Sequence, residues 1–153
     1  MKKLTLILLA FVFFAVLFFP CLFIRDMSGD ILVKPLIGES KIKISYIHSV
    51  QKTPVEEYLK VKTFGKIKLY ETRYQSFGVG LPFLESEGVF YQDGDYYVMD
   101  MERTFNDLAL RVGKGTNLTL EADGVFLPLY KTLPSGARVE MFTKPYIIGK
   151  FFR

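Results

Sequence analysis

The chain has 153 residues, half of which are hydrophobic, and a formal net charge of +4. This length corresponds to one ordinary domain, and the apolar fraction is sufficient to fill its core. A single cysteine excludes an intramolecular disulfide and a zinc site built from several cysteines. Without Lys2 and Lys3 the balance is 18 basic against 16 acidic residues, a net charge of +2, and no basic run alternates with aromatic residues. We therefore expect no nucleic-acid partner.

The N-terminal residues predict a segment that enters a membrane. Residues 4–24 carry no charge and are rich in Leu, Ile, Val and Phe. With a rise of about 1.5 Å per residue, a helix of this length would cross a hydrocarbon core of about 30 Å. A cleaved signal peptide is the alternative, but the region around Cys21 lacks the small residues of a cleavage site. Their absence also argues against lipidation of Cys21, and we favour an uncleaved anchor.

Two parts follow from this pattern. Residues 1–25 are expected to form an N-terminal transmembrane anchor or signal segment, and residues 26–153 an extracytoplasmic β domain. Lys2 and Lys3 precede the apolar run, which places the N-terminus inside by the positive-inside rule. The β domain would then lie on the outer side of the cytoplasmic membrane.

The rest of the chain predicts an all-β fold, an antiparallel β-sandwich or small barrel built from hairpins. Short alternating runs are separated by turn residues at intervals typical of such folds. Asp93-Gly94 is the strongest hairpin signal, because this pair favours a two-residue turn. The expected strands are residues 31–37, 41–50, 55–62, 66–74, 89–92, 95–101, 107–112, 117–122, 125–130 and 137–143.

The only histidine lies in the second of these strands. Alternation over residues 41–50 places His48 on the apolar face and Ser49 on the opposite face. In the strand of residues 55–62, Glu57 belongs to the apolar set. Each of the two strands therefore carries one titratable side chain among its core-facing residues.

Loop lengths extend this pattern to a third strand. A four-residue loop over residues 51–54 would pair His48 with Glu57. A three-residue loop over residues 63–65, ending in glycine, would pair Glu57 with Glu71. The sequence thus predicts a row of His48, Glu57 and Glu71 across three strands.

Such a row has four interpretations, because a buried carboxylate is costly unless it is paired or hydrogen-bonded. It could be a structural network, or a cluster that recognises a small polar or cationic solute. It could be a metal site, with His48, Glu57 and Glu71 as ligands, although no spacing motif supports one. It could serve a hydrolase or isomerase using His48 with Glu57 or Glu71, but Ser49 faces away from the histidine. We expect no cofactor, and favour the non-catalytic interpretations.

A glycine-rich loop follows the third strand. Gly78 and Gly80 allow close backbone approach and positive φ, and Leu81 and Pro82 complete the loop. Exposed amides here could bind an anion, but no Lys-Ser/Thr follows, so this is not a phosphate loop. The loop is expected to lie near Glu71.

These segments together resemble a known family. The runs YIHSV, PVEEY and SFGVGLP are similar to those of the DUF1850 family of bacterial and archaeal proteins, and the similarity extends over roughly residues 41–143. The family's recurring positions correspond to His48, Ser49, Glu57, Gly78, Gly80, Leu81 and Pro82.

The resemblance implies a role but no established activity. Members are often encoded beside TRAP transporters of the TAXI subclass. By that association the chain would be a membrane-anchored accessory subunit of a solute uptake system, acting as a docking or solute-handling module. The implied partners are the membrane, the transporter permease or its substrate-binding protein, and a small solute.

Overall fold

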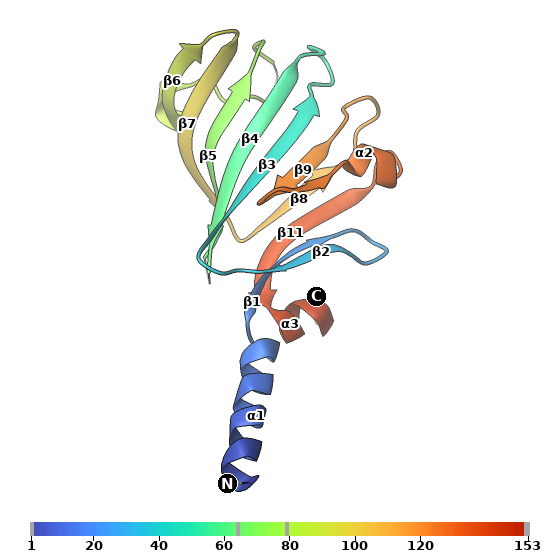
Figure 1. Ribbon diagram of the computed structural model, residues 1–153. Coiled ribbons are helices and arrows are strands. Elements are labelled where there is room, and N and C mark those ends of the chain that lie inside the picture. The colour runs from blue at the N-terminus through green and yellow to red at the C-terminus, as the bar shows by residue number, and fades with distance from the viewer. Residues whose placement is uncertain (1, 64, 79, 152–153) are drawn as a thin grey trace.

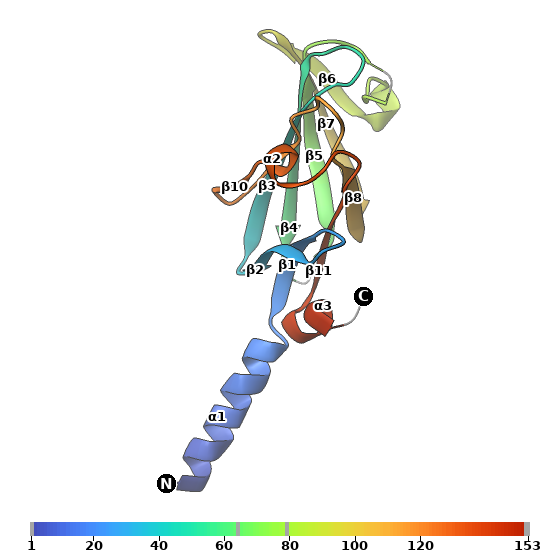
Figure 2. The same ribbon diagram turned by 90° about the vertical axis from the view of Figure 1, so that its right-hand side faces the viewer.

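The computed structural model describes residues 2–63, 65–78 and 80–151 as an N-terminal helix followed by a two-sheet β domain (Figure 1). Helix α1 (Lys2–Leu17) projects from one end of the β domain. The C-terminal helix α3 (Tyr146–Phe151) lies at the same end, as the turned view in Figure 2 also shows. The two terminal helices, α1 and α3, are therefore at one end of the domain.

All strand pairs in the two sheets are antiparallel. The smaller sheet has the order β2-β1-β11-β8 and the larger one β10-β9-β3-β4-β5-β7-β6. The strands of the smaller sheet are β1 (Pro20–Arg25), β2 (Asp30–Pro35), β8 (Asp107–Arg111) and β11 (Arg138–Pro145). Those of the larger sheet are β3 (Glu39–Ile47), β4 (Pro54–Lys62), β5 (Ile67–Tyr74), β6 (Gly88–Asp93), β7 (Tyr96–Phe105), β9 (Thr119–Ala122) and β10 (Val125–Leu127). A 3-10 turn η1 (Glu85–Glu87) and a short helix α2 (Leu129–Thr132) complete the domain.

The core lies between the two sheets. Alternate residues of each strand point inward, as their apolar character predicts. Fully buried members include Leu22, Ile24 and Met141 from the smaller sheet, and Ile44, Leu59 and Leu120 from the larger one. The prediction of an antiparallel, mostly β protein with sandwich architecture is confirmed. The predicted hairpin at Asp93-Gly94 also forms, with Asp93 paired to Tyr96.

The N-terminal apolar run divides into two different elements, and the prediction of one continuous helix over residues 4–24 is wrong. Helix α1 ends at Leu17, and Pro20 begins β1. Proline lacks the backbone donor that a helix needs, which favours a break there. The β domain thus includes residues that the sequence assigned to the segment 1–25. None of the helices in the described residues is long and apolar enough to cross a membrane.

Strand β1 is buried on both faces, which explains its continuous apolar sequence. One face packs into the core. On the other, Phe23 stacks on Phe142 with ring centroids 5.2 Å apart, and Gly149 of α3 packs against the Phe23 ring. Cys21, on the same face, is 3% exposed.

Arg25 links this outer face to α3. Its Nε donates to Asp30 Oδ1 and its Nη2 to the Gly149 carbonyl, each at 2.6 Å. The guanidinium also lies 5.4 Å from the centroid of the Phe142 ring. Lys150 forms a second ion pair with Asp30, at 2.7 Å. Arg25 is only 8% exposed, so these partners must compensate the loss of hydration of its charged guanidinium.

This arrangement predicts a large loss of stability for Arg25→Leu. The substitution leaves the Gly149 carbonyl without this donor and Asp30 with Lys150 alone. We expect the free energy of unfolding to fall by about 3 to 5 kcal/mol, as for other broken buried ion pairs. The control is Arg138→Leu, because Arg138 pairs with Glu140 on the same sheet but its side chain is 52% exposed. Its expected loss is below about 1 kcal/mol. Equal losses by denaturant titration would contradict the role given to Arg25.

Candidate functional site

The β3–β4 hairpin has a different register from the predicted one. Ile44 pairs with Glu57 and Tyr46 with Val55, and β3 ends at Ile47. The predicted pairing of His48 with Glu57 is therefore wrong. The chain reverses over residues 48–53 instead of the expected residues 51–54.

His48 itself builds this longer loop. Its Nδ1 accepts hydrogen bonds from the backbone amides of Val50 at 3.3 Å and Gln51 at 3.1 Å. Its own amide donates to the Thr53 carbonyl at 2.9 Å, and its carbonyl accepts from the Lys52 amide at 2.9 Å. The side chain is 7% exposed. The imidazole holds the loop conformation, because its Nδ1 supplies the acceptor for two backbone amides of the turn.

The β4–β5 hairpin begins in the predicted register. Leu59 pairs with Leu69, and Val61 with Ile67. Phe64, within the predicted loop of residues 63–65, lies outside the described residues. A register shift between Tyr58 and Leu59 then interrupts the ladder.

This irregularity moves Glu71 to the outer face of the sheet. Glu71 pairs with Tyr58, and Thr72 takes the inward position opposite Glu57, where it is 1% exposed. The Glu71 carboxylate lies 4.0 Å from Arg73 Nε. The predicted row of His48, Glu57 and Glu71 does not form, because a bulge reverses the alternation beyond it.

His48 and Glu57 nevertheless line one pocket. It has a volume of about 310 Å³ and lies between β3 and β4 of the larger sheet and β8 of the smaller one. Its walls are formed by Ile44, Tyr46, Ile47, His48, Ser49, Glu57, Leu110, Arg111, Thr116 and Leu118. Ser49 was predicted to face away from His48, but β3 ends at Ile47, so strand alternation no longer applies to it.

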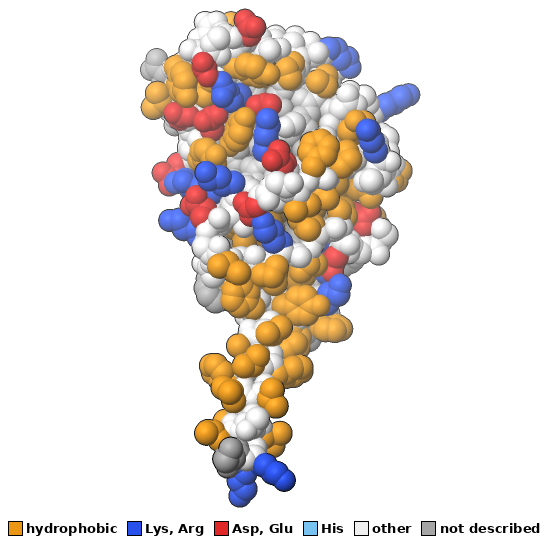
Figure 3. All heavy atoms as spheres, in the orientation of Figure 1, with side chains coloured by type: hydrophobic (Ala, Val, Ile, Leu, Met, Phe, Trp, Pro, Cys, Tyr) orange, Lys and Arg blue, Asp and Glu red, His pale blue; other side chains and the backbone are white. Residues whose placement is uncertain are grey.

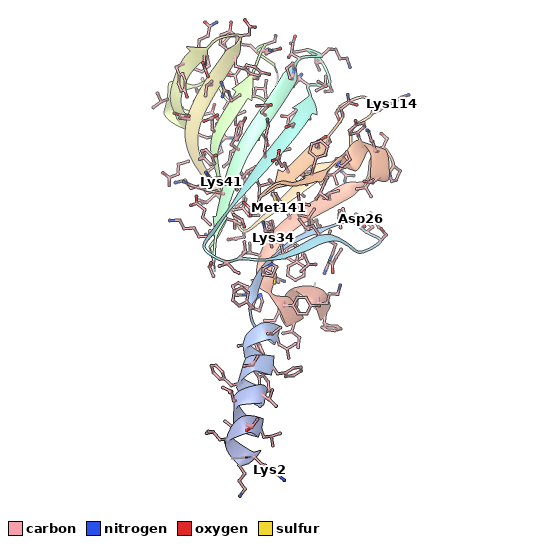
Figure 4. The ribbon with its side chains drawn as sticks, in the orientation of Figure 1. Lys2, Asp26, Lys34, Lys41, Lys114 and Met141 are labelled. Atoms are coloured by element: carbon pink, nitrogen blue, oxygen red, sulfur yellow. The ribbon has the colours of Figure 1, made fainter. Side chains whose placement is uncertain are left out.

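The pocket lies at the end of the β domain opposite α1. Strand β3 begins beside the β4–β5 turn, where the Thr63 amide donates to the Gly38 carbonyl at 2.9 Å. It ends where Ile47 donates to the Thr116 carbonyl at 2.6 Å. Lys114, in the same loop as Thr116, is labelled in Figure 4 at the far end of the domain from Lys2.

Glu57 is the unusual group in this pocket. It lies on the inward face of β4 between buried Val55 and Leu59. Burial raises the pKa of its carboxyl, and this outweighs the lowering by the Tyr46 hydroxyl and by the charge of Arg103. The Tyr46 hydroxyl donates to Glu57 Oε1 at a long 3.4 Å. The carboxylate is thus partly desolvated and incompletely compensated.

The predicted glycine-rich loop packs on His48. A Cβ added at Gly78 would come 2.9 Å from His48 Cε1 and 3.0 Å from Nε2, so the backbone packs directly on the imidazole. Gly80 has a φ of 89°, in the region that glycine favours. Val79 lies outside the described residues.

The remainder of this loop is anchored on β4 and β5. Leu81 is buried in a small cluster with Val55 and Tyr74. The Tyr74 hydroxyl donates to the Pro82 carbonyl at 2.5 Å. Of the predicted loop residues, Gly78 thus contacts His48 directly, and Leu81 and Pro82 hold the loop on Tyr74.

Sequence reasoning missed the opposite wall of the pocket. Leu110 and Arg111 come from β8, and Thr116 from the loop that follows it. The contact of the Tyr46 hydroxyl with Glu57 was also missed, because it depends on the observed register of β3 and β4. In the part of the chain that the structure describes, no three or more His, Cys, Asp or Glu residues are grouped so as to hold a metal.

The contact of Gly78 with His48 predicts an energetic coupling. Gly78→Ala should lower the free energy of unfolding by about 1 to 3 kcal/mol, because the methyl group displaces the imidazole. The loss should shrink when the same change is made in a His48→Ala background. Gly80→Ala is the control, since its Cβ would meet no atom within 4 Å and its cost, of about 1 to 2 kcal/mol, arises from positive φ. A double-mutant cycle with no coupling between Gly78 and His48 would contradict this contact.

The raised pKa of Glu57 predicts a pH-dependent stability. Its folded-state pKa lies above the ordinary value of 4.5, so the native protein loses stability as pH rises from that value through the folded-state pKa. Glu57→Gln should therefore be more stable than the wild type at pH 8, and the difference should disappear below pH 4.5. The measurement is denaturant titration across this pH range.

Glu56 supplies a control of opposite sign on the other face of β4. Its pKa is lowered overall by Lys43, 2.6 Å away, and by the Tyr58 hydroxyl, despite a desolvation effect that raises it. The ionised Glu56 carboxylate therefore stabilises the native protein above pH 4.5, and this stabilisation is lost as the pH falls through the lowered pKa. Glu56→Gln should thus be less stable than the wild type at pH 8. The same sign for both variants would contradict the assignment.

Comparison with known proteins identifies the family but adds no activity. The family model described as a domain of unknown function, DUF1850, matches residues 42–129. No curated protein and no solved structure matches the chain. The matched region contains most of β3 and all of β4 to β10, and therefore His48, Glu57 and the glycine-rich loop. Because the match covers more than half of the sequence, the chain belongs to the DUF1850 family.

Proposed function

We propose that this protein is a membrane-anchored, extracytoplasmic module that binds a small cationic solute in the pocket at His48 and Glu57. The observation that supports this most is the inward-facing carboxylate of Glu57 in an open pocket. Tyr46 and Arg103 stabilise the negative charge of Glu57 only in part. A positively charged group of a ligand, placed beside the carboxylate, would stabilise it further.

The shape and chemistry of the pocket fit this class of ligand. Its volume of about 310 Å³ is at the lower end of the range for small-molecule sites. Ile44, Leu110 and Leu118 supply apolar walls, and Ser49 and Thr116 supply hydroxyl groups. Arg111 adds a positive charge to the opposite wall. A compact solute with its cationic group at Glu57, away from Arg111, and with a short apolar body would match these features.

The membrane location is supported by the surface of α1. None of its residues is buried, and its apolar side chains are exposed on all sides, for example Leu4 by 74% and Phe11 by 71%. Figure 3 shows apolar atoms along α1, with the lysines at its free end. A helix that is hydrophobic all round needs an apolar surrounding. We place α1 in the cytoplasmic membrane, with Lys2 and Lys3 inside and the β domain outside.

The transport role is the part of the proposal that rests on family resemblance. Proximity to transporters of the TAXI subclass of TRAP systems supports an accessory subunit that exchanges solute with the permease or with its substrate-binding protein. The site at the end opposite α1 would face the compartment from which such a solute is captured.

The solute proposal is tested on the full chain in detergent micelles. The probes are 1,4-diaminobutane and choline as cations, succinate as an anion and glycerol as a neutral solute. We expect the cations to raise the thermal unfolding midpoint of the wild type, and Glu57→Gln to abolish the shift because it removes the charge. Glu71→Gln is the matched control, since it makes the same chemical change on the outer face and should preserve the shift. A shift that survives Glu57→Gln, or one produced equally by succinate, would refute the proposal.

The partner proposal is tested by affinity capture of the tagged chain from cross-linked membranes of its native host. We expect a TRAP permease or its binding protein in the captured fraction. A Lys2→Glu, Lys3→Glu variant tests the orientation, because reversed charge should reduce the outward placement of the β domain. Capture without any transporter component would refute the partnership.

A further inference from the structure

We propose that the end of the β domain from which α1 emerges rests on the headgroup layer of a lipid bilayer, with its exposed apolar side chains in the interface. This inference rests on the proposed membrane location of α1 but is independent of the pocket. It assigns to the domain a second surface, whose partner is lipid.

The α1 end of the domain is a connected platform, not a set of loose loops. The Pro20 carbonyl accepts from the Leu36 amide at 2.9 Å, and the Phe19 carbonyl accepts from the Tyr146 amide at 2.9 Å. Thr63 Oγ1 donates to the Leu36 carbonyl at 3.0 Å. The Gly65 carbonyl accepts from Thr143 Oγ1 at 3.2 Å. These bonds join the α1–β1 connection, the β2–β3 loop, the β4–β5 turn and the start of α3.

Exposed apolar side chains surround the base of α1 on this platform. Ile37 is 82% exposed and Phe151 75%, and Phe19 and Tyr146 are each more than one third exposed. Figure 3 shows that apolar atoms continue from α1 onto the adjoining part of the domain. An apolar surface that continues from a lipid-embedded helix is most simply covered by the same lipid.

A groove between α1 and the platform has the same character. Its volume is about 450 Å³, with Val12, Val16 and Phe19 on one side and Cys21, Pro35 and Tyr146 on the other. The Tyr146 hydroxyl is the polar exception among these side chains. Tyrosine favours the membrane–water boundary, where its ring is apolar and its hydroxyl is hydrated.

The charges on the platform are complementary to lipid phosphate. Lys62 and Lys66 flank the β4–β5 turn and are exposed. Lys144, next to Cys21 in the β1–β11 ladder, adds a third cation. Glu39 pairs with Lys62 in the β3–β4 ladder and offsets part of this charge. Lysines close to an anionic lipid surface are attracted to it.

The length of α1 gives a reason for close contact. Sixteen helical residues extend about 24 Å, whereas the hydrocarbon core is about 30 Å thick. A short apolar segment draws its flanking residues toward the bilayer, or thins it locally. Phe19, Ile37 and Tyr146 would enter the interface for this reason.

The test uses tryptophan fluorescence, since the chain has no natural tryptophan. Ile37→Trp places the probe on the platform, and Val50→Trp, at a residue 67% exposed in the His48 loop, places it at the opposite end. Each full-length variant is reconstituted into phosphatidylcholine–phosphatidylglycerol vesicles with acyl chains brominated near the headgroup. We expect I37W to lose roughly half of its fluorescence through interfacial contact with bromine, and V50W to be unaffected.

Vesicle sedimentation separates this inference from the proposed location. If the chain sediments with vesicles but I37W is not quenched, the platform contact is refuted and the anchor stands. If the chain remains in the supernatant, both are refuted. Equal quenching of I37W and V50W also refutes the inference, because the domain would have no preferred orientation.

Charge-reversal variants test the lysines. Lys62→Glu with Lys66→Glu should reduce the quenching of I37W in vesicles that contain phosphatidylglycerol. Lys52→Glu with Lys114→Glu changes the net charge equally at the opposite end and should leave quenching unchanged. Equal effects of the two pairs would refute the electrostatic contact at the platform.

Discussion

The pairing of β1 with β11 is the interaction on which the rest of the structure depends. It joins Pro20 to Pro145 and Arg25 to Glu140, so strands from the two ends of the chain form the centre of the smaller sheet. That sheet covers the apolar face of β3, β4 and β5, and burial of such a face contributes about 25 cal/mol per Å². Bringing together strands so distant in sequence costs conformational entropy. The burial of apolar surface offsets this cost only when the whole face is covered. The same pairing brings α1 and α3 to one end of the domain and thereby separates the two termini from the pocket.

Local patterns in the sequence predicted most strands because their neighbours in the larger sheet are close along the chain. Alternation and turn residues indicated β4, β5 and the β6–β7 hairpin within a few residues. Strand β1 was missed for a physical reason. A strand buried on both faces is continuously apolar, so it extends the apolar run of α1 without a visible boundary other than Pro20. Its partner β11 begins more than 100 residues later, and no local signal identifies such a pair.

The site was partly predictable, and its errors have identifiable causes. The sequence correctly indicated Glu57 as a polar residue on the inward face of β4. His48 lines the same pocket, but from the loop after β3 and not from a strand face. Loop length could not be read from the sequence, because the longer turn depends on the Nδ1 atom of His48 accepting two amides. The bulge between Leu69 and Glu71 could not be predicted from the sequence either, and it turned Glu71 outward. The wall formed by Arg111 and Thr116 is a product of sheet packing. Gly78 was recognised as a glycine that allows close approach, but what approaches it is known only from the fold.

The short connection between α1 and β1 has a consequence for how far the pocket can reach. Only Phe18 and Phe19 separate the helix from the first strand, and Phe19 also accepts a hydrogen bond from Tyr146. The domain therefore has no flexible tether on which it could tilt its far end down to the bilayer. Strand β3 spans nine residues, or about 30 Å, between the platform and the pocket. With α1 in the membrane, the protein diffuses laterally while its pocket stays about 30 Å above the platform. If the proposed transport role holds, a permease that exchanges solute with the pocket must itself extend about 30 Å above the lipid, or must receive the solute from a second soluble carrier.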